Sequence, residues 1–458
     1  MRLFSESVKM TTRNRSASDR APVKILLADT NWWANSARLA IGLAEVGCDL
    51  SAICRMPNHP LMKTRAVRRT FPYTAFSPLS ALRAAIEQVD PDLVIPACDR
   101  SVGHLHELYG EAQVRGEAGC KIRTLIERSL GAPASYAIVS SRYMLLSIAQ
   151  EEGIRVPQTR LVTRPAALEE WSKEPFPWVL KADKTWGGGG VWIVHSHEET
   201  KSSLRQVEQL SRFSRAIKRL IVNRDPFWLR DWCVGSERDI IAQTYIDGKP
   251  ANCTAVCWKG RVLAAIAVRV ARTEGVTGPA SIVHIVEGGE MLEAARKIVA
   301  RLDLSGFCGF DFVEETSTGK AYLVEMNPRI APPCHLRLGN GKDLAGALWA
   351  QLACRPLPKP TAETEAGLVA YFPQGLKNEN EIPPGCFKDI PYEEPDLVSE
   401  MLNPFPDRTF LFRLAQFVSR RSAPAKITYA ELEGADGQNL SGGKQDTVQF
   451  ERKVTAGN

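Results

Sequence analysis

The feature that most constrains this chain of 458 residues is a pair of alternating segments, 309–313 (GFDFV) and 321–327 (AYLVEMN). A turn rich in Thr, Ser and Gly separates them, which predicts an antiparallel hairpin. In that register Asp311 lies opposite Glu325. Because side chains two residues apart on a strand share a face, Asn327 joins Glu325 there. One face of the hairpin is therefore expected to present two carboxylates and one amide oxygen.

These three side chains are hard oxygen ligands of the kind that Mg²⁺ takes, while water and phosphate fill its other positions. An ordinary apolar core would not hold them, since an unpaired buried charge is costly. The alternative is a solvated strand face whose charges are matched by Arg329. Both interpretations remain open on these residues alone.

A second candidate group combines a lysine with a glycine loop. Residues 178–182 predict a strand that contains Lys181, and residues 191–195 predict the return strand. Between them stand four consecutive glycines, Gly187, Gly188, Gly189 and Gly190. A lysine offers compact charge for phosphate, and glycines let backbone N–H groups approach anionic oxygens. The glycines alone are also typical of a plain flexible loop.

A third segment is Gln243-Thr244-Tyr245-Ile246. Its alternating backbone and side-chain donors and acceptors suit the edge of an adenine ring. By itself the segment is more typical of an ordinary strand. Two apolar strands follow this segment. Asp247-Gly248 joins the segment to the first strand and Lys259-Gly260 joins the first strand to the second, which predicts two successive hairpins.

The first part of the chain alternates strands with helices, which is typical of a doubly wound α/β domain. We expect strands at 23–28, 49–54 and 92–96, and helices at 35–46 and 78–89. The turn after the first strand, DTNWW, has no glycine, so the dinucleotide-binding pattern is absent. Asp29 and Asp99 at the strand ends either line a ligand crevice or cap helices.

Composition narrows the class of protein. Hydrophobic content of 44% with 24% charged residues is typical of a globular chain, and the net charge of +6 is too modest for a nucleic-acid binder. The 11 cysteines include no C-x-x-C pair, which argues against disulfides and structural zinc. No apolar run is long enough to span a bilayer. We therefore expect a cytoplasmic protein without nucleic-acid or membrane partners.

The leader 1–20 lacks the apolar core of a secretory signal, although an organellar transit peptide remains an alternative.

The order of these pieces resembles the ATP-grasp superfamily, in particular the carbamoyl-phosphate synthase large chain, biotin carboxylase and related carboxylate–amine ligases. The resemblance covers roughly residues 23–357, and its most specific element is Glu325-Met326-Asn327-Pro328-Arg329 downstream of 306–312. It implies a Rossmann-like α/β domain before a two-lobed ATP-grasp domain of α+β character. The implied division is a pre-ATP-grasp domain 21–130, an ATP-grasp domain 131–356 with lobes at about 155–215 and 236–356, and an extension 357–433. Composition, rather than the resemblance, predicts a disordered leader 1–20 and a disordered tail 434–458.

The resemblance also implies how a nucleotide would be held. Lys181 would contact the α- and β-phosphates, and Gly187 to Gly190 would close over the triphosphate. Arg142 stands where the family usually has lysine and would bind phosphate from the other side. Gln243, where the family commonly has glutamate, would take the adenine amino group. Tyr245 and Ile246 would supply backbone contacts and packing at the ring.

At the reaction centre, the resemblance implies that Asp311, Glu325 and Asn327 hold two Mg²⁺ ions, with Mn²⁺ as an alternative. Arg329 would stabilise the transferring phosphoryl group. Asn252 occupies a position where the family often has glutamate. None of the departures removes a proposed metal ligand, so an active enzyme is expected.

The implied function is an ATP- and Mg²⁺-dependent ligase that activates a carboxylate as an acyl phosphate and couples it to an amine. A small-molecule kinase and a non-catalytic ATP-binding regulatory module are the alternatives. Whether the chain forms a homodimer is left open. Three arginines in segments expected to face the reaction centre are candidates for binding the substrate carboxylate, with two histidines nearby. They are Arg269, Arg272 and Arg337, then His284 and His335.

Overall fold

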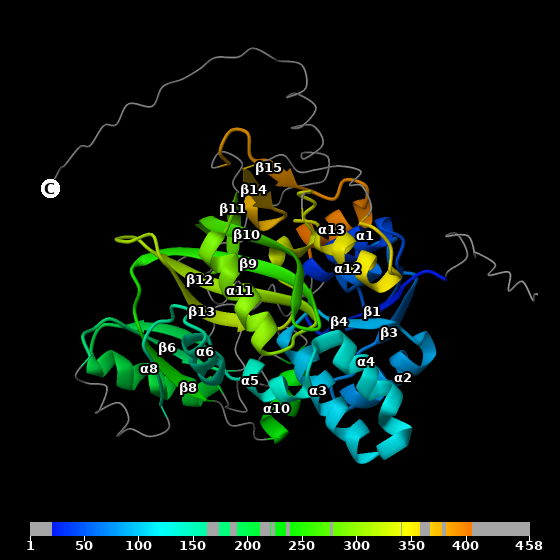
Figure 1. Ribbon diagram of the computed structural model, residues 1–458, viewed down its shortest axis with the longest axis horizontal. Helices are drawn as coiled ribbons and strands as arrows, with labels where there is room; N and C mark the ends of the chain where they lie inside the picture. The colour runs from blue at the N-terminus through cyan, green and yellow to red at the C-terminus, as the bar shows by residue number, and fades with distance from the viewer. Residues whose placement is uncertain are drawn as a thin grey trace, which may run out of the picture.

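The structure is a computed structural model. It describes residues 21–162, 174–183, 190–210, 220, 225–234, 239–274, 278–339, 341–357, 367–377 and 382–404. The expected leader 1–20 and the expected tail 434–458 lie outside the described residues. Figure 1 shows the three parts: N-terminal elements in blue to cyan, a large green-to-yellow sheet beside them, and a smaller sheet with β6 and β8.

The N-terminal part contains a parallel sheet of order β3-β2-β1-β4, as the doubly wound pattern predicts. Its strands are β1 (Lys24–Asp29), β2 (Asp49–Cys54), β3 (Arg69–Pro72) and β4 (Leu93–Pro96). Its helices are α1 (Asn35–Glu45), α2 (Pro78–Val89), α3 (Asp99–Val114) and α4 (Cys120–Leu130). Strands buried on both faces read as continuous apolar runs, which is why β1, β2 and β4 were visible in the sequence.

A small antiparallel sheet of order β5-β8-β6-β7 follows. Its strands are β5 (Thr159–Leu161), β6 (Trp178–Ala182), β7 (Val191–Val194) and β8 (Ile240–Thr244). The helices in this stretch of the chain are α5 (Tyr136–Val139), α6 (Arg142–Glu151), α8 (His197–Leu210) and α10 (Phe227–Val234), and α10 packs on the N-terminal part through Phe227. The predicted strand pair around the glycine loop is confirmed, since β6 and β7 pair antiparallel.

The large sheet has the order β13-β12-β9-β10-β11-β14-β15. Its strands are β9 (Gly248–Trp258), β10 (Arg261–Thr273), β11 (Ala280–Val286), β12 (Gly306–Glu315), β13 (Ala321–Asn327), β14 (Leu368–Tyr371) and β15 (Phe387–Asp389). Beside it lie α11 (Gly289–Arg301), the 3₁₀ turn η4 (Pro332–His335), α12 (Leu344–Ala353) and α13 (Pro395–Leu402). Strands β14 and β15 come from the segment expected to be a C-terminal extension.

One of the two predicted hairpins is wrong. The turn at Lys259-Gly260 joins β9 to β10, with φ of 46° and 71° at its two central residues, as a tight hairpin turn requires. Asp247-Gly248 joins no hairpin, because β8 belongs to the small sheet and β9 to the large one. At Gly248 a Cβ would lie 2.2 Å from the carbonyl oxygen of Glu314, so this glycine permits close strand contact. The chain thus crosses between the two lobes here.

A shared core joins the N-terminal part to the large sheet. Buried side chains of α1, α12, β14 and α13 belong to one apolar cluster that includes Leu43, Leu348, Val369 and Leu397. Since close-packed interiors resist deformation, the N-terminal part and the large sheet form a continuous wall. Within the described residues, no helix is long and apolar enough to cross a membrane.

Candidate active site

The predicted hairpin face forms as expected. Strands β12 and β13 pair antiparallel with Asp311 opposite Glu325, and β9 places Asn252 on the other side of Asp311. Asp311 Oδ1 accepts a hydrogen bond from Asn252 Nδ2 at 2.6 Å, and its Oδ2 accepts one from Asn327 Nδ2 at 3.0 Å. A cross-strand row of Glu325, Asp311 and Asn252 therefore lies on one face of the large sheet.

The carboxylates of Asp311 and Glu325 are neighbours in this half-buried row, so it is unfavourable for both to be charged unless a cation is nearby. Burial, and then the charge of Glu325, raise the pKa of Asp311 to about 6, against the hydrogen bond from Asn252 and the charges of Arg329 and Lys181. No group of three or more His, Cys, Asp and Glu side chains arranged for a metal occurs in the described part of the chain. The oxygen donors present are two carboxylates and nearby amides. Such a set fits a hard cation that takes few protein ligands and keeps water or phosphate at its other positions.

Arg142 ties this face to the small sheet. It is the first residue of α6, whose start is capped by the Ser141 hydroxyl. Its Nη2 donates to Glu325 Oε1 at 2.7 Å, and its Nη1 donates to Asp183 Oδ1 at 2.9 Å and to the Ala182 carbonyl at 2.8 Å. The guanidinium fork thus bridges two carboxylates that lie on different sheets.

Lys181 lies on β6 and points at the same face. It is buried, and its Nζ donates to the Val324 carbonyl on β13 at 3.3 Å. Burial lowers the pKa of Lys181 to about 8, although the charge of Glu325 opposes the shift. A buried ammonium has lost much of its hydration. A phosphate bound beside Lys181 would replace that hydration and favour the charged form, so this position is suited to a polyanion.

Arg329, two residues beyond β13, joins the reaction centre to the N-terminal part. Its Nε donates to Asp99 Oδ1 at 2.9 Å and its Nη2 to Asn327 Oδ1 at 3.1 Å. The guanidinium also lies over the Trp33 ring, 5.7 Å from its centroid. Of the two aspartates at strand ends, Asp99 therefore contacts the site. Asp29 instead accepts from Asn31 N and Ser36 Oγ within the turn after β1.

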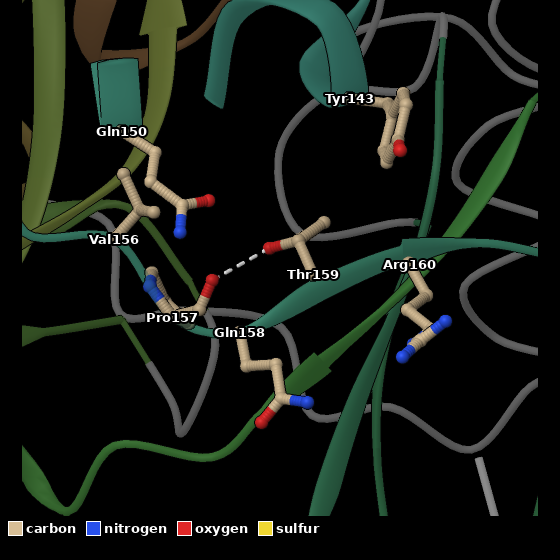
Figure 2. Close-up of a pocket in the computed structure, with 7 residues that line it drawn as sticks. All are labelled: Tyr143, Gln150, Val156, Pro157, Gln158, Thr159 and Arg160. Atoms are coloured by element: carbon tan, nitrogen blue, oxygen red, sulfur yellow. Dashed lines mark hydrogen bonds between the residues drawn. The ribbon is translucent and has the colours of Figure 1, made fainter. Parts of the chain in front are cut away.

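The adenine candidate Gln243 is buried on β8, and its orientation follows from a short hydrogen-bond chain. Thr159 Oγ1 donates to the Pro157 carbonyl at 2.8 Å, so this hydroxyl oxygen accepts from Gln243 Nε2 at 3.0 Å. Figure 2 shows the Thr159–Pro157 contact in a surface hollow of about 380 Å³ beside β5. This arrangement aims the amide nitrogen at Thr159 and leaves Gln243 Oε1 as an acceptor.

One cavity of about 1040 Å³ collects most of the candidates. All three parts of the structure contribute to its lining, which includes Lys181, Gln243, Tyr245, Ile246, Asp311, Glu325, Asn327 and Arg329. Arg142 meets the site through Glu325. Gly187, Gly188 and Gly189 lie outside the described residues, whereas the Gly190 carbonyl accepts from Ala182 N at 2.9 Å beside β7.

The three arginines considered for the substrate carboxylate have other contacts. Arg269 pairs with Glu314, Arg272 donates to the Gly375 carbonyl, and Arg337 pairs with Glu45. None of the three is among the described residues that line the cavity. The two histidines behave likewise, because His335 pairs with Asp389 at 2.7 Å and His284 is exposed on β11.

Sequence reasoning missed several residues of the cavity wall. The turn after β1 contributes Trp32 and Trp33, and β14 contributes Tyr371. The adjacent tryptophans were a usable signal, since two large aromatic side chains in a turn need an apolar surface or a ligand to pack against. Tyr371 gave no such signal, because its place in the sheet depends on a long-range pairing.

The fold and these side chains define a nucleotide-binding architecture of two lobes with a Rossmann-like domain in front. Residues 139–333 match the family described as ATP-grasp domain, so the chain contains an ATP-grasp domain. The structure is similar to L-amino acid ligase from Bacillus licheniformis (16% identity, 76% of this chain and 78% of that one, TM-score 0.52). It is also similar to N5-carboxyaminoimidazole synthase from Aspergillus clavatus in complex with ADP and 5-aminoimidazole ribonucleotide (14%, 75% and 80%, 0.53). A third similar structure is biotin carboxylase from Campylobacter jejuni (16%, 73% and 72%, 0.50). At these identities the likeness establishes the fold.

Proposed function

We propose that the protein is an ATP- and Mg²⁺-dependent ligase that activates a carboxylate as an acyl phosphate and couples it to an amine. The observation that carries the proposal is the meeting of the Asp311–Glu325 pair with Lys181 and Arg329 in one cavity. A half-buried pair of acids flanked by the buried cations Lys181 and Arg329 is suited to positioning a metal-bound polyphosphate and neutralising its charge in the transition state.

The nucleotide would lie between the two sheets. Gln243 Oε1 would accept from the adenine amino group, with Tyr245 and Ile246 along the ring edge. The hydrogen-bond chain through Thr159 supports this orientation, because it holds the amide nitrogen of Gln243 away from the ring. Lys181 and Arg142 would hold phosphate oxygens, and the loop with Gly187 to Gly190 would cover them.

Asp311, Glu325 and Asn327 would hold Mg²⁺, in our proposal as two ions, with Mn²⁺ as a substitute. When bound, the metal would supply positive charge to the phosphate oxygens. Glu325 must then share its carboxylate with Arg142, and Asn327 Oδ1 must turn from Arg329 to the cation. This exchange gives Arg329 a free donor for the transferring phosphoryl group.

The proposed chemistry has two steps. A substrate carboxylate oxygen attacks the γ-phosphorus of ATP, the bond to the β–γ bridging oxygen breaks, and an acyl phosphate and ADP form. The amine then attacks the acyl carbon, the C–O bond to phosphate breaks, and an amide and inorganic phosphate form as the amine proton passes to phosphate. Arg329 would balance charge on the phosphoryl group, and closure between the lobes would keep water from the acyl phosphate.

The test is a panel of carboxylic acids incubated with the protein, ATP and Mg²⁺, with hydroxylamine as a general amine. A ligase converts the acyl phosphate to a hydroxamate and releases equal amounts of ADP and phosphate, both dependent on the acid. ADP with a stable phosphorylated product and no phosphate would identify a kinase instead. Tight ATP binding with no turnover across acid and amine panels would identify a regulatory module and overturn the proposal.

A further inference from the structure

The face of the large sheet that forms the floor of the cavity changes from polar to apolar along one row of paired residues. The row begins with Glu325, Asp311 and Asn252 on β13, β12 and β9. Asn252 is paired with Val268 on β10, so the next position on the same face is apolar. All four side chains line the cavity. The floor is therefore polar over three strands and turns apolar at β10.

The apolar half continues to the far side of the sheet. Val270 shares its face with Val268 and is paired with Val283 on β11. Val283 is paired with Val369 on β14, and Tyr371, two residues on, shares that face. Val270, Val283 and Tyr371 all line the cavity. Four strand spacings, about 19 Å, separate β12 from β14, and Tyr371 also lies four residues along β14 from the row that contains Asp311.

The far end of the cavity has aromatic walls and one unsatisfied polar atom. Phe372 lines the cavity next to Tyr371, and Trp32 lines it from the turn after β1. Tyr371 is only 3% exposed, and its hydroxyl is buried without a hydrogen-bond partner. A buried hydroxyl with no partner is costly, so a ligand group that accepts its hydrogen bond would remove that cost. Burial raises the pKa of Tyr371 well above its ordinary value, which keeps the hydroxyl a donor.

Charge limits what the far end can bind. The basic side chains among the described lining residues are Lys181, Arg329 and Lys377. The first two belong to the reaction centre, and Lys377 forms an ion pair with Glu274. The far end also contains the buried carboxylate of Glu400. Among the described lining residues, this end therefore offers a phosphate or a second carboxylate no arginine clamp of the kind that such groups normally receive.

We propose that the carboxylic acid activated by this protein carries an unphosphorylated apolar body, which lies on the β10 part of the cavity floor beside the half-buried Val270 and ends in a ring or acceptor group beside Tyr371. The proposal rests on the ligase function above and specifies its substrate. It separates this chain from a ligase for a phosphorylated ribonucleotide, because such a substrate would need a second anion site.

The first experiment measures hydroxamate formation over a series of straight-chain and ω-phenyl carboxylic acids, with matched ω-dicarboxylic and ω-phosphorylated acids. Each added methylene should raise kcat/KM about fourfold until the body reaches the far wall. The anionic analogues should fall at least tenfold below their apolar counterparts. Equal or better turnover of the anionic acids would overturn this inference while leaving the ligase function intact. No hydroxamate from any acid would instead count against the ligase function.

Two substitutions locate the body on the sheet. Val270→Lys places a cation on the apolar half and should lower kcat/KM for a long apolar acid at least tenfold while raising it for the ω-dicarboxylic acid. Tyr371→Phe keeps the ring and should lower kcat/KM about tenfold for an acid with an acceptor group at its end, with little change for the plain alkyl acid.

Tyr322→Phe on β13, which does not line the cavity, is the matched control. If Val270→Lys unfolds, Val270→Thr tests the same contact through a smaller dependence on chain length. Unchanged preferences in folded variants would contradict the inference.

Discussion

Arg142 and Glu325 stand 183 residues apart in the chain, yet their Nη2 and Oε1 atoms form an ion pair at 2.7 Å. The same guanidinium holds Asp183 and the Ala182 carbonyl at the end of β6. One side chain at the start of α6 therefore links the small sheet to the proposed metal face. A planar guanidinium presents its donors in a fixed fork and can do this, whereas a lysine ammonium is a compact point charge on a flexible stem.

Arg142→Lys should therefore leave one of its two carboxylates without a partner. We expect a loss of about 1–3 kcal/mol in the free energy of unfolding, together with a several-fold higher KM for ATP, since the charge is retained but the bridge is lost. Urea denaturation and ATP-dependent turnover measure the two effects. Arg155→Lys is the control, because the Arg155–Glu290 pair is largely exposed and should cost under 1 kcal/mol. Wild-type values for both quantities in Arg142→Lys would show that the bridge has no role.

Glu325→Gln should abolish ATP turnover while the fold remains intact. Glutamine keeps an oxygen for Arg142 but loses the charge that would bind the metal, so we expect at least a 100-fold decrease in kcat. Phosphate release measures activity, and thermal denaturation with and without Mg²⁺ and ADP measures ligand binding. Glu314→Gln is a matched control, because Glu314 is also on β12–β13 but pairs with Arg269 away from the cavity. Turnover within threefold of wild type in Glu325→Gln would remove this residue from the site.

The proposed metal face could be predicted because it depends only on two strands that are neighbours in the sequence. Alternation on both sides of a short turn fixed the register, and the register alone placed Asp311 opposite Glu325. The strands of the N-terminal sheet were visible for a similar reason, since burial on both faces leaves continuous apolar runs.

The wrong predictions concern segments whose local sequence suggests one role while contacts with distant parts of the chain impose another. Asp247-Gly248 has the composition of a hairpin turn, but Gly248 is needed for contact with the Glu314 backbone at the crossing between lobes. The arginines of β10 were assigned to the substrate because their segments face the site, although Arg269 itself pairs with Glu314 outside the cavity. The aromatic wall required knowing that β14 pairs with β11, about 85 residues away. No property of a single segment carries that pairing.

Asp389 should be essential for joining β15 to the rest of the molecule. It is buried between Arg38 of α1 and His335 of η4, and its carboxylate accepts from both. Removing it by Asp389→Ala leaves Arg38 buried without its partner, so we expect a loss of about 3–5 kcal/mol in unfolding free energy. Asp396→Ala, at an exposed position in the first turn of α13, should cost less than about 1 kcal/mol.

The same pair of variants gives a pH dependence. Burial raises the pKa of Asp389, but the charges of His335 and Arg38 outweigh it, so the net effect is a lowered pKa. Its stabilisation is therefore present above the unfolded pKa of about 4 and is lost as the pH falls through the lower folded value. The difference in unfolding free energy between wild type and Asp389→Ala should shrink below pH 4. A difference that stays constant down to pH 3 would show that Asp389 is not ionised in the folded protein.

Asp29 should have the opposite pH dependence. It lies at the end of β1, fully buried, with Ser36 and Asn31 as hydrogen-bond donors. Burial raises its pKa from 3.8 to about 7 despite these donors. Because the folded state binds the proton more tightly than the unfolded state, this group destabilises the fold increasingly as the pH rises from about 4 to 7.

Asp29→Asn removes the titration while retaining the shape of the side chain. Relative to wild type, the variant should therefore gain about 3 kcal/mol in unfolding free energy between pH 5 and pH 8, since one pKa unit corresponds to about 1.4 kcal/mol. Urea denaturation of both proteins at the two pH values measures the change, and Asp90→Asn, at the exposed end of α2, is the control for the Asp-to-Asn substitution itself. A stability difference between Asp29→Asn and wild type that does not depend on pH would mean that Asp29 keeps an ordinary pKa, and that the turn carrying Trp32 and Trp33 is anchored by a charged carboxylate.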